Sequence, residues 1–455
     1  MAGAYPSTPF LLPRMKTLFR SLLAATLLAA PVAVSAQTPA AATAADTARI
    51  ELNPALINAV NTQSFEQFRE TVRPLIAQMA DKKVVALGEG THGTAEFYQV
   101  RFWLTRILME EHGFRQVALE NTYGSARLVD EALHQHGAPA LKPRMQKHLL
   151  SIWQNQETAA MLNWMKEYNH RHNRRHHVSL TGIDAMFGTD DALLVQAGLS
   201  KRNPTLRPHI EQLVKSAAFQ DAMWLHINDA GFKFDRKGWL SNGLAGYAAA
   251  DELLKALPTA RLPRIQREAL ELTLQNSRMV FDYPYQVQFH KRDSSRDSLF
   301  AAMAQLLVRK PGSKLIIWSH NAHLSRQSMD PTDNNGGGTG AFLERMFPGQ
   351  YFVLGTSTAF GTFAATQQAF ISPLSPMAAY PLPTPKAGSW EASLAQVSSP
   401  AFFFNTHQLG SQDVQRPQRL VGQTPTSTDQ YGNYRLSKAY DALLFLRTTT
   451  AATPL

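Results

Sequence analysis

The chain has 455 residues, of which 45 are Lys or Arg and 35 are Asp or Glu, so its formal charge at pH 7 is +10. This charge is modest for the length. It favours acidic ligands or surfaces but does not by itself indicate a nucleic-acid-binding protein. The absence of cysteine excludes disulfide bonds, thiolate metal sites and cysteine nucleophiles. The length is typical of two to three domains.

Residues 1–36 have the composition of a secretory signal peptide. A basic segment over 14–20 precedes a stretch of apolar and small residues, and a Val-Ser-Ala sequence ending at Ala36 fits a cleavage site. An N-terminal membrane anchor is the alternative, but the apolar stretch is short and Pro31 interrupts it. We therefore expect cleavage after Ala36, a flexible N-terminus over 37–50, and a periplasmic or secreted protein.

Residues 53–80 have helical periodicity, and the next segment is typical of a strand, a helix and a second strand. The apolar run Val84–Leu87 ends in a loop with three glycines, after which Thr94 is placed to cap a helix. Gly113 ends this helix, and Gln116–Leu119 is the second strand. A crossover helix between two strands implies a parallel pair, so both strands end at the same edge of a sheet.

Helices are also expected over 123–136 and 157–171. The second runs into the histidine- and arginine-rich segment 170–177. That segment has side chains that bind metals or anions, but cations at the end of a helix more often complement the helix dipole. Residues 190–285 have helical periodicity throughout and contain many aromatic side chains, which fit either an ordinary core or the lining of an apolar cleft.

Further strands are expected over 178–183, 314–318, 351–355, 401–404 and 442–446. Strands that alternate with helices indicate an α/β fold. We therefore expect a mostly parallel central sheet flanked by helices, formed by residues 51–189 and 300–455. A helical insertion or lid is expected over 190–299.

Four of the expected strands end in an ionisable residue: Glu89, Glu120, Asp184 and His320. Each of them fits the N-cap of a following helix, but histidine is a poor cap, and four such residues at the ligand edge of a sheet indicate a site. His92, His320 and His323 are candidate general bases, because imidazole titrates near neutral pH. Glu89 or Glu120 would orient the base. Arg101, beside the apolar stripe of its helix, needs a partner for its charge.

Two other chemistries remain open for the same residues. Zinc or manganese binds through histidines and carboxylates, although the segment from Glu89 to His92 is not the helical zinc-protease pattern. A protein that holds an apolar or haem-like ligand through the histidines, without catalysis, is the other alternative. A serine hydrolase is disfavoured because the chain has no Gly-x-Ser-x-Gly elbow, and no phosphate-binding or dinucleotide loop is found.

Three motifs together resemble the erythromycin esterase family: Leu87–Gly93, Val117–Glu120 and Trp318–His323. The resemblance extends from about Phe65 to the C-terminus. It implies an α/β core with a helical insertion around a deep cleft. It also implies hydrolysis of an ester by histidine-activated water, without a serine nucleophile and without an obligatory metal, so we expect no cofactor. Some members of the family cleave macrolide lactones and confer antibiotic resistance.

By this resemblance, His92 is the general base, and Glu89 and Glu120 orient or tune it. The side chains expected to position the ester or stabilise its oxyanion are Arg101, His320 and His323. Asp184 and Arg292 are expected to bind the substrate. Arg292 begins an Arg-Asp pair that matches the family, although the residues after the pair depart from the family pattern. The expected partner is a small-molecule ester or lactone rather than nucleic acid or a membrane, and the oligomeric state is unknown.

Overall fold

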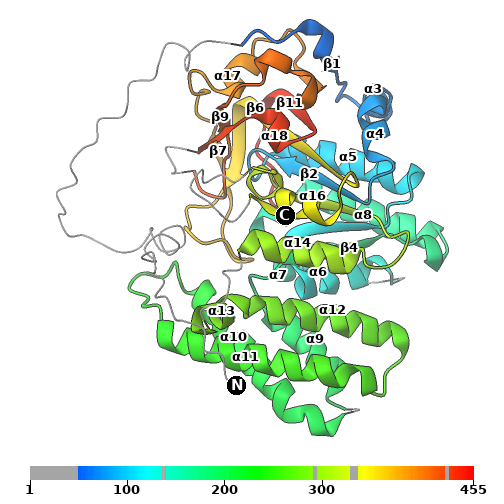
Figure 1. Cartoon of the computed structure of the whole chain (residues 1–455), viewed down its shortest axis with the longest axis vertical. Helices are drawn as coiled ribbons and strands as arrows, with labels where there is room; N and C mark the ends of the chain where they lie inside the picture. The colour runs from blue at the N-terminus through cyan, green and yellow to red at the C-terminus, as the bar shows by residue number, and fades with distance from the viewer. Residues whose placement is uncertain are drawn as a thin grey trace, which may run out of the picture. The chain divides into compact units, whose positions relative to one another are not determined.

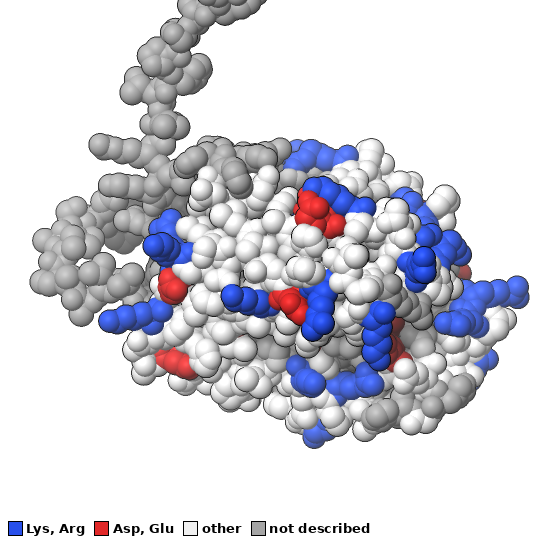
Figure 2. Space-filling view, turned by 90° about the horizontal axis from the view of Figure 1, so that it is seen from below, with Lys and Arg blue, Asp and Glu red and all other residues white. Residues whose placement is uncertain are grey.

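The computed structural model describes residues 50–135, 137, 140–201, 203–289, 295–327, 337–425 and 430–455, which belong to one compact unit. The expected signal peptide lies outside these residues, and so does Arg292. None of the helices in these ranges combines the length and apolarity that a membrane span requires. Figure 2 shows one face of the molecule, on which Lys and Arg side chains are scattered, several of them beside Asp or Glu, without forming one continuous basic stripe.

The core of the fold is a sheet in the order β1-β8-β11-β6-β2-β5-β3-β4 (Figure 1). Its strands are β1 (Asn58–Ala59), β8 (Ala401–Asn405), β11 (Ala442–Thr449), β6 (Tyr351–Ala365), β2 (Val84–Glu89), β5 (Leu315–His320), β3 (Gln116–Thr122) and β4 (Ser179–Asp184). All neighbours from β11 to β4 are parallel, whereas β8 is antiparallel to both β11 and β1. The predicted mostly parallel sheet is thus confirmed.

Three short strands lie outside this path. β7 (Ala378–Pro381) pairs antiparallel with the end of β6, and β9 (Arg416–Arg419) pairs with β10 (Tyr431–Tyr434) in a separate ribbon. These strands were not expected from the sequence. They are short, and most of β7 is exposed, so they lack the apolar runs that indicate buried strands.

The strand, helix and strand around the first motif form β2, α5 (Ala95–Glu111) and β3. The two strands are parallel, as expected, but they are not neighbours because β5 lies between them. Val84 and Gln116 both align with Leu315 in register. The carboxyl ends of β2, β5 and β3 therefore meet at one edge of the sheet.

Alternation along the strands divides the core into two layers. Val85 and Leu87 face one layer, which contains α3 (Phe65–Thr71), α4 (Arg73–Met79), α5 and α8 (Gln156–Arg171). Val84 and Ala86 face the other layer, which contains α14 (Arg296–Leu307), α16 (Thr339–Met346), α17 (Trp390–Leu394) and α18 (Leu436–Ala439). Both faces of the sheet are covered, which is why β2 and β5 are buried along their whole lengths.

Five helices pack around a core of their own, drawn in green in Figure 1. They are α9 (Thr189–Leu199), α10 (Arg207–Leu225), α11 (Arg236–Ala256), α12 (Arg264–Val280) and α13 (Asp282–Phe289). This core includes Val195, Leu213, Leu253 and Leu274. α14 belongs to the layer on the sheet instead, and it begins at Arg296. The aromatic residue Trp239 is buried, as an ordinary core residue would be.

The expected helix over 53–80 is wrong. Residues 54–56 form a 3₁₀ turn, β1 joins the sheet edge, and only α3 and α4 are helical. Pro74 stands in the first turn of α4 and has no N–H, so α3 cannot continue through it as one helix. The helix expected over 123–136 is α6 (Tyr123–Asp130), followed by a 3₁₀ turn at Glu131–Leu133. α7 (Leu141–His148) follows.

Candidate active site

The loop after β2 is held from both sides by backbone hydrogen bonds. The Gly90 carbonyl accepts from Val421 N (2.8 Å), and His92 N donates to the Val421 carbonyl (3.0 Å). Gly93 has φ +70°, and a Cβ there would lie 2.0 Å from the Ala364 carbonyl oxygen. Only glycine fits this conformation and this close approach. The backbone of His92 is therefore fixed relative to the sheet.

Thr94 is the N-cap residue of α5, as expected, but its side chain does not cap the helix. Its hydroxyl hydrogen-bonds with the hydroxyl of Thr91 instead. This contact closes the loop on itself. At the other end of the helix, Gly113 follows the C-cap residue His112, with φ +74° and open space where a side chain would lie.

His92 and Glu89 form a directly bonded pair. His92 Nδ1 lies 2.7 Å from Glu89 Oε1, and both side chains are buried or nearly so. Because an ionised carboxylate only accepts hydrogen bonds, Nδ1 carries the proton and Nε2 keeps its lone pair. No described residue hydrogen-bonds to Nε2. An imidazole oriented in this way can take a proton from water.

Arg101 holds Glu89 from the other side. Its Nη2 donates to Glu89 Oε2 at 2.6 Å, and its guanidinium lies 4.7 to 5.5 Å from the ring centres of Tyr98, Trp153 and Trp318. The side chain is completely buried. We expected Arg101 to position the ester, but a guanidinium behind Glu89 has no exposed atom to offer a substrate. Its role in this geometry is to hold the Glu89 carboxylate in place and to supply its buried counterion.

Glu120 lies at the centre of the other half of the site. Oε2 accepts from Ser319 Oγ (2.6 Å) and from His320 N (3.1 Å), and Oε1 accepts from Arg296 Nη2 (3.0 Å). His323 Nε2 lies 3.5 Å from the same oxygen. Burial alone would raise the pKa of Glu120, but the positive charges of His323 and Arg296 outweigh it and hold this pKa well below its usual range. These charges favour the ionised form of Glu120 at the sheet edge near neutral pH.

Arg296 is a site residue that was not predicted from the sequence. It makes a two-point contact with Asp184, through Nε to Oδ1 (3.2 Å) and Nη2 to Oδ2 (2.5 Å). Asp184 also accepts from Ala185 N, so this carboxylate, which we expected to bind substrate, is already engaged by the protein. The Arg296 side chain is 41% exposed, whereas Asp184 is buried. Its remaining nitrogen, Nη1, lies 3.3 Å from His323 Nε2, so Arg296 connects Asp184 to His323 and still has an exposed edge that can contact a polar group of a ligand.

His323 is anchored by Asp297, the second residue that was missed. His323 Nδ1 lies 2.9 Å from Asp297 Oδ1, which also accepts from the backbone and hydroxyl of Thr339. Burial lowers the pKa of His323, but the charges of Asp297 and Glu120 outweigh this effect and raise the pKa above its ordinary value. These contacts link α14, α16 and the short helix Asn321–Leu324 that follows β5.

A sequence signal for Arg296 and Asp297 was present. They are a second Arg-Asp pair, four positions after the Arg292 pair that we selected. Ser295 before them forms a capping box with Ser298, a pattern that places the pair in the first turn of a helix. Arg292 itself lies outside the described residues.

His320 does cap a helix, contrary to our expectation that histidine is a poor cap. Its Nδ1 accepts from Ala322 N (3.3 Å) at the start of α15 (Asn321–Leu324), so the ring proton is on Nε2. Nε2 makes no well-formed hydrogen bond within the described residues, and the Val421 carbonyl lies beside the ring. Burial and the neighbouring His92 lower the pKa of His320 well below its ordinary value, against the charge of Glu120. His320 is thus a neutral imidazole with a loosely held donor.

The two halves of the site meet at the histidines. The rings of His92 and His320 lie 4.7 Å apart between centres, so the free base and the neutral N–H donor adjoin each other. Within the described ranges, no three His, Cys, Asp or Glu side chains are grouped as metal ligands would be. In the histidine-rich segment after α8, His172 Nδ1 instead donates to the Tyr168 carbonyl at the helix end (2.7 Å).

Solved structures share this fold. A protein described as a succinoglycan biosynthesis protein matches with a TM-score of 0.69 over 88% of this chain and 96% of its own. A mutant of the erythromycin esterase EreC in its open conformation matches with a TM-score of 0.62 over 88% of this chain and 99% of its own. Both are 18% identical to this chain, so they support the fold alone.

Sequence relatives are more specific. Erythromycin esterase type I of Escherichia coli is 26% identical over 259 residues, which is 54% of this chain and 62% of that protein. Erythromycin esterase type II of the same species is 26% identical over 36% of this chain and 35% of its own length. The putative hydrolase YbfO of Bacillus subtilis strain 168 is 21% identical over 71% of this chain and 74% of its own. The chain thus matches less than two thirds of the length of either esterase.

The family model described as erythromycin esterase matches residues 109–449, about three quarters of the chain. The matched region contains Glu120, Asp184, His320 and His323, and it begins after the Glu89 and His92 pair. The chain therefore belongs to the erythromycin esterase family.

Proposed function

We propose that this protein is a carboxylic ester hydrolase that uses water activated by His92. The observation that carries the proposal is the buried Glu89 and His92 pair, which leaves Nε2 as a free base beside the neutral donor of His320. A serine nucleophile is not needed for this chemistry. Family membership supports the same reaction type.

In the first step, His92 Nε2 takes a proton from water while the water oxygen bonds to the ester carbonyl carbon. The carbonyl oxygen becomes an oxyanion, which the His320 Nε2–H stabilises by a hydrogen bond. In the second step, the bond from carbon to the alkoxide oxygen breaks and the imidazolium of His92 returns its proton to the leaving oxygen. The products are an acid and an alcohol, and no group on the protein is consumed.

Glu89 stabilises the imidazolium that forms between the two steps, and Arg101 holds Glu89 in position from the other side. Arg296 and His323, both held by buried or half-buried carboxylates, present positive charge at the same edge of the sheet. These charges suit the carbonyl and carboxylate oxygens of an ester and its product.

A macrolide lactone is the substrate class that we propose. Two of the relatives are named erythromycin esterases, and a lactone is an internal ester, so the same two steps open its ring. We also propose that the enzyme acts in the periplasm or outside the cell, on the basis of the signal-like composition of residues 1–36.

The test is hydrolysis of a panel of macrolides and simple esters, with products identified by mass spectrometry as the gain of one water. His92→Gln should lower kcat by about 10²–10⁴-fold, the usual contribution of a general base. The matched control is His226→Gln. His226 Nδ1 lies 2.7 Å from Asp229 Oδ2 at the same sequence spacing, but on the exposed surface of the helical unit.

Each outcome decides something. Full activity in His92→Gln would contradict its role as the base. Activity that is lost with EDTA and restored by zinc or manganese would replace the proposal with a metal-dependent hydrolase. If no ester in the panel is hydrolysed, the proposed activity is wrong, and binding without turnover would favour a ligand-binding protein.

A further inference from the structure

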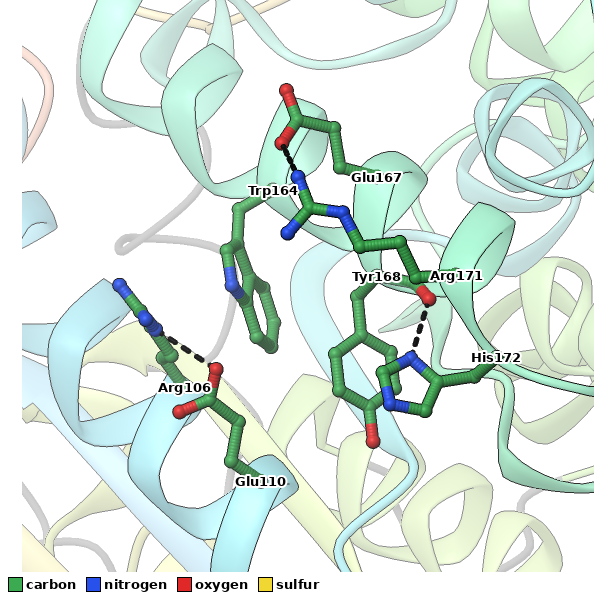
Figure 3. A pocket seen from close by; sticks show the side chains of 7 residues that line it. All are labelled: Arg106, Glu110, Trp164, Glu167, Tyr168, Arg171 and His172. Carbon is green, nitrogen blue, oxygen red and sulfur yellow. Dashed lines mark hydrogen bonds and ion pairs between the residues drawn. The ribbon is translucent and has the colours of Figure 1, made fainter.

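A pocket outside the candidate active site lies between the outer faces of α5 and α8 (Figure 3). Its volume is about 500 Å³, within the range of small-ligand sites. None of the candidate active-site residues, including His92, lines this pocket. α5 begins beside the catalytic loop and runs back along the sheet, so Arg106 and Glu110 lie about 7–14 Å beyond Arg101 along the helix axis. The pocket therefore belongs to another part of the surface than the ester site.

One wall of the pocket is a row of rings. Trp164 and Tyr168 lie four residues apart on one face of α8, and His172, the C-cap residue of this helix, follows four residues later. The ring centres of Trp164 and Tyr168 are 5.3 Å apart, and those of Tyr168 and His172 are 4.0 Å apart and nearly parallel. Phe102 on α5 packs against Trp164, with 5.9 Å between their ring centres. The Arg106 guanidinium lies 6.0 Å from the Trp164 ring centre, and His172 covers one face of Tyr168, so the half-buried Trp164 is the ring with most surface left for a ligand.

The other lining residues carry charges that cancel within the pocket. Arg106 Nε donates to Glu110 Oε1 at 3.0 Å, and Arg171 Nη2 donates to Glu167 Oε2 at 2.9 Å. Figure 3 shows the Arg106 and Glu110 pair on one side of Trp164 and Tyr168 on the other. Each pair is joined through one guanidinium nitrogen and one carboxylate oxygen. The other nitrogens and the other oxygen of each pair can therefore still hydrogen-bond to a ligand at the rim of the pocket. None of the described residues hydrogen-bonds to the Tyr168 hydroxyl.

This combination selects for a particular ligand chemistry. Ring faces with a negative quadrupole attract the C–H groups of a flat, weakly polar surface. Paired guanidinium and carboxylate groups match two adjacent hydroxyls, because both groups are planar and bond at two points. A lining without net charge gives no advantage to a charged ligand. A pyranose ring has one C–H face and a rim of neighbouring hydroxyls, and it carries no charge.

We propose that the pocket between α5 and α8 binds a neutral pyranose saccharide. Trp164 is the platform on which the sugar ring stacks, and Tyr168, Arg171 and Glu110 bond its hydroxyls. The site is independent of the proposed esterase activity, since none of these residues belongs to the catalytic edge of the sheet.

The experiment titrates the full protein with cellobiose, maltose and N,N′-diacetylchitobiose, followed by saturation-transfer NMR and calorimetry. At least one of these probes should bind. Trp164→Leu should weaken it about three- to tenfold, the value of one aromatic stacking contact. Arg171→Ala, at a side chain that is 74% exposed, should weaken it by a smaller factor without affecting folding. The matched control is Trp224→Leu, a half-buried tryptophan on α10 that stacks on Phe370.

Three results would overturn the proposal. The first is the absence of binding for all three probes up to about 10 mM. The second is binding that Trp164→Leu and Trp224→Leu weaken equally. The third is preferential binding of an acidic oligosaccharide, such as a digalacturonate, over the neutral probes, because it would show that the pocket binds anionic ligands. Ester hydrolysis by Trp164→Leu should equal that of the unaltered protein.

Discussion

Arg101 and Glu89 form an ion pair without solvent contact, and its removal should be costly. The two side chains are 0% exposed, and Arg101 Nη2 lies 2.6 Å from Glu89 Oε2. Arg101→Met preserves most of the volume but leaves the carboxylate buried without its cation. Breaking a buried pair by removing one partner costs about 3–5 kcal/mol. Loss of the contacts to the rings of Tyr98, Trp153 and Trp318 adds to this cost.

The assay is urea unfolding, followed by circular dichroism, of four proteins: the unaltered chain, Arg101→Met, Glu89→Gln and the double variant. We expect the double variant to lose about 1–3 kcal/mol less unfolding free energy than the two single variants lose together, because it leaves no buried charge without a partner. The control is Glu110→Gln on the same helix. Its pair with Arg106 has side chains that are 31% and 28% exposed, so the change should cost no more than about 1 kcal/mol.

If Arg101→Met lowered the free energy of unfolding by less than about 1 kcal/mol, this reasoning would be refuted, because a loss that small is typical of an exposed ion pair and not of a buried one. Strict additivity in the double variant would also refute it. Neither measurement needs a substrate, so this test stands apart from the proposed esterase function.

Three further predictions follow from the same geometry. Gly93→Ala should destabilise the fold by more than Gly113→Ala, as measured by thermal unfolding. Both glycines have positive φ, which costs a substituted alanine about 1–2 kcal/mol, but only at Gly93 would the new Cβ also collide with a backbone oxygen. His320→Ala should lower kcat about 10²–10³-fold with a smaller change in KM, as expected for loss of an oxyanion donor, and steady-state kinetics measures this. The raised pKa of His323 means that its contribution to stability is full below its ordinary pKa of 6.5 and is lost as pH rises through the raised value. The lowered pKa of Glu120 gives a contribution that is present above 4.5 and lost in acid. His323→Gln should therefore flatten the decline in unfolding free energy above about pH 6.5, and it should also lessen the acid decline because His323 helps to lower the pKa of Glu120.

Local sequence patterns were enough to predict the main strands and the edge that they share. Short apolar segments such as Val84–Leu87 and Gln116–Leu119, each bounded by polar or glycine residues, favour buried strands, and the helix between them favours a parallel arrangement. Glu89, His92, Glu120 and His320 stand at or just after the ends of such runs. Their convergence on one edge therefore followed from local pattern and chain topology alone.

The contacts between these residues depend on long-range packing. β5 enters between β2 and β3 from about 200 residues away along the chain, and no local pattern encodes that pairing. Its insertion brings His320 against His92 and Ser319 against Glu120. Arg101 is a buried counterion because β5 supplies Trp318 above it.

The same holds for the second half of the site. The capping pattern at Ser295 marks Arg296 and Asp297 as the start of a helix, but a helix start by itself does not indicate a functional site. Their importance comes from where α14 docks on the sheet, opposite Asp184 and His323. A charge pattern along a chain indicates which residues need partners, and the packing of distant elements decides which partners they find.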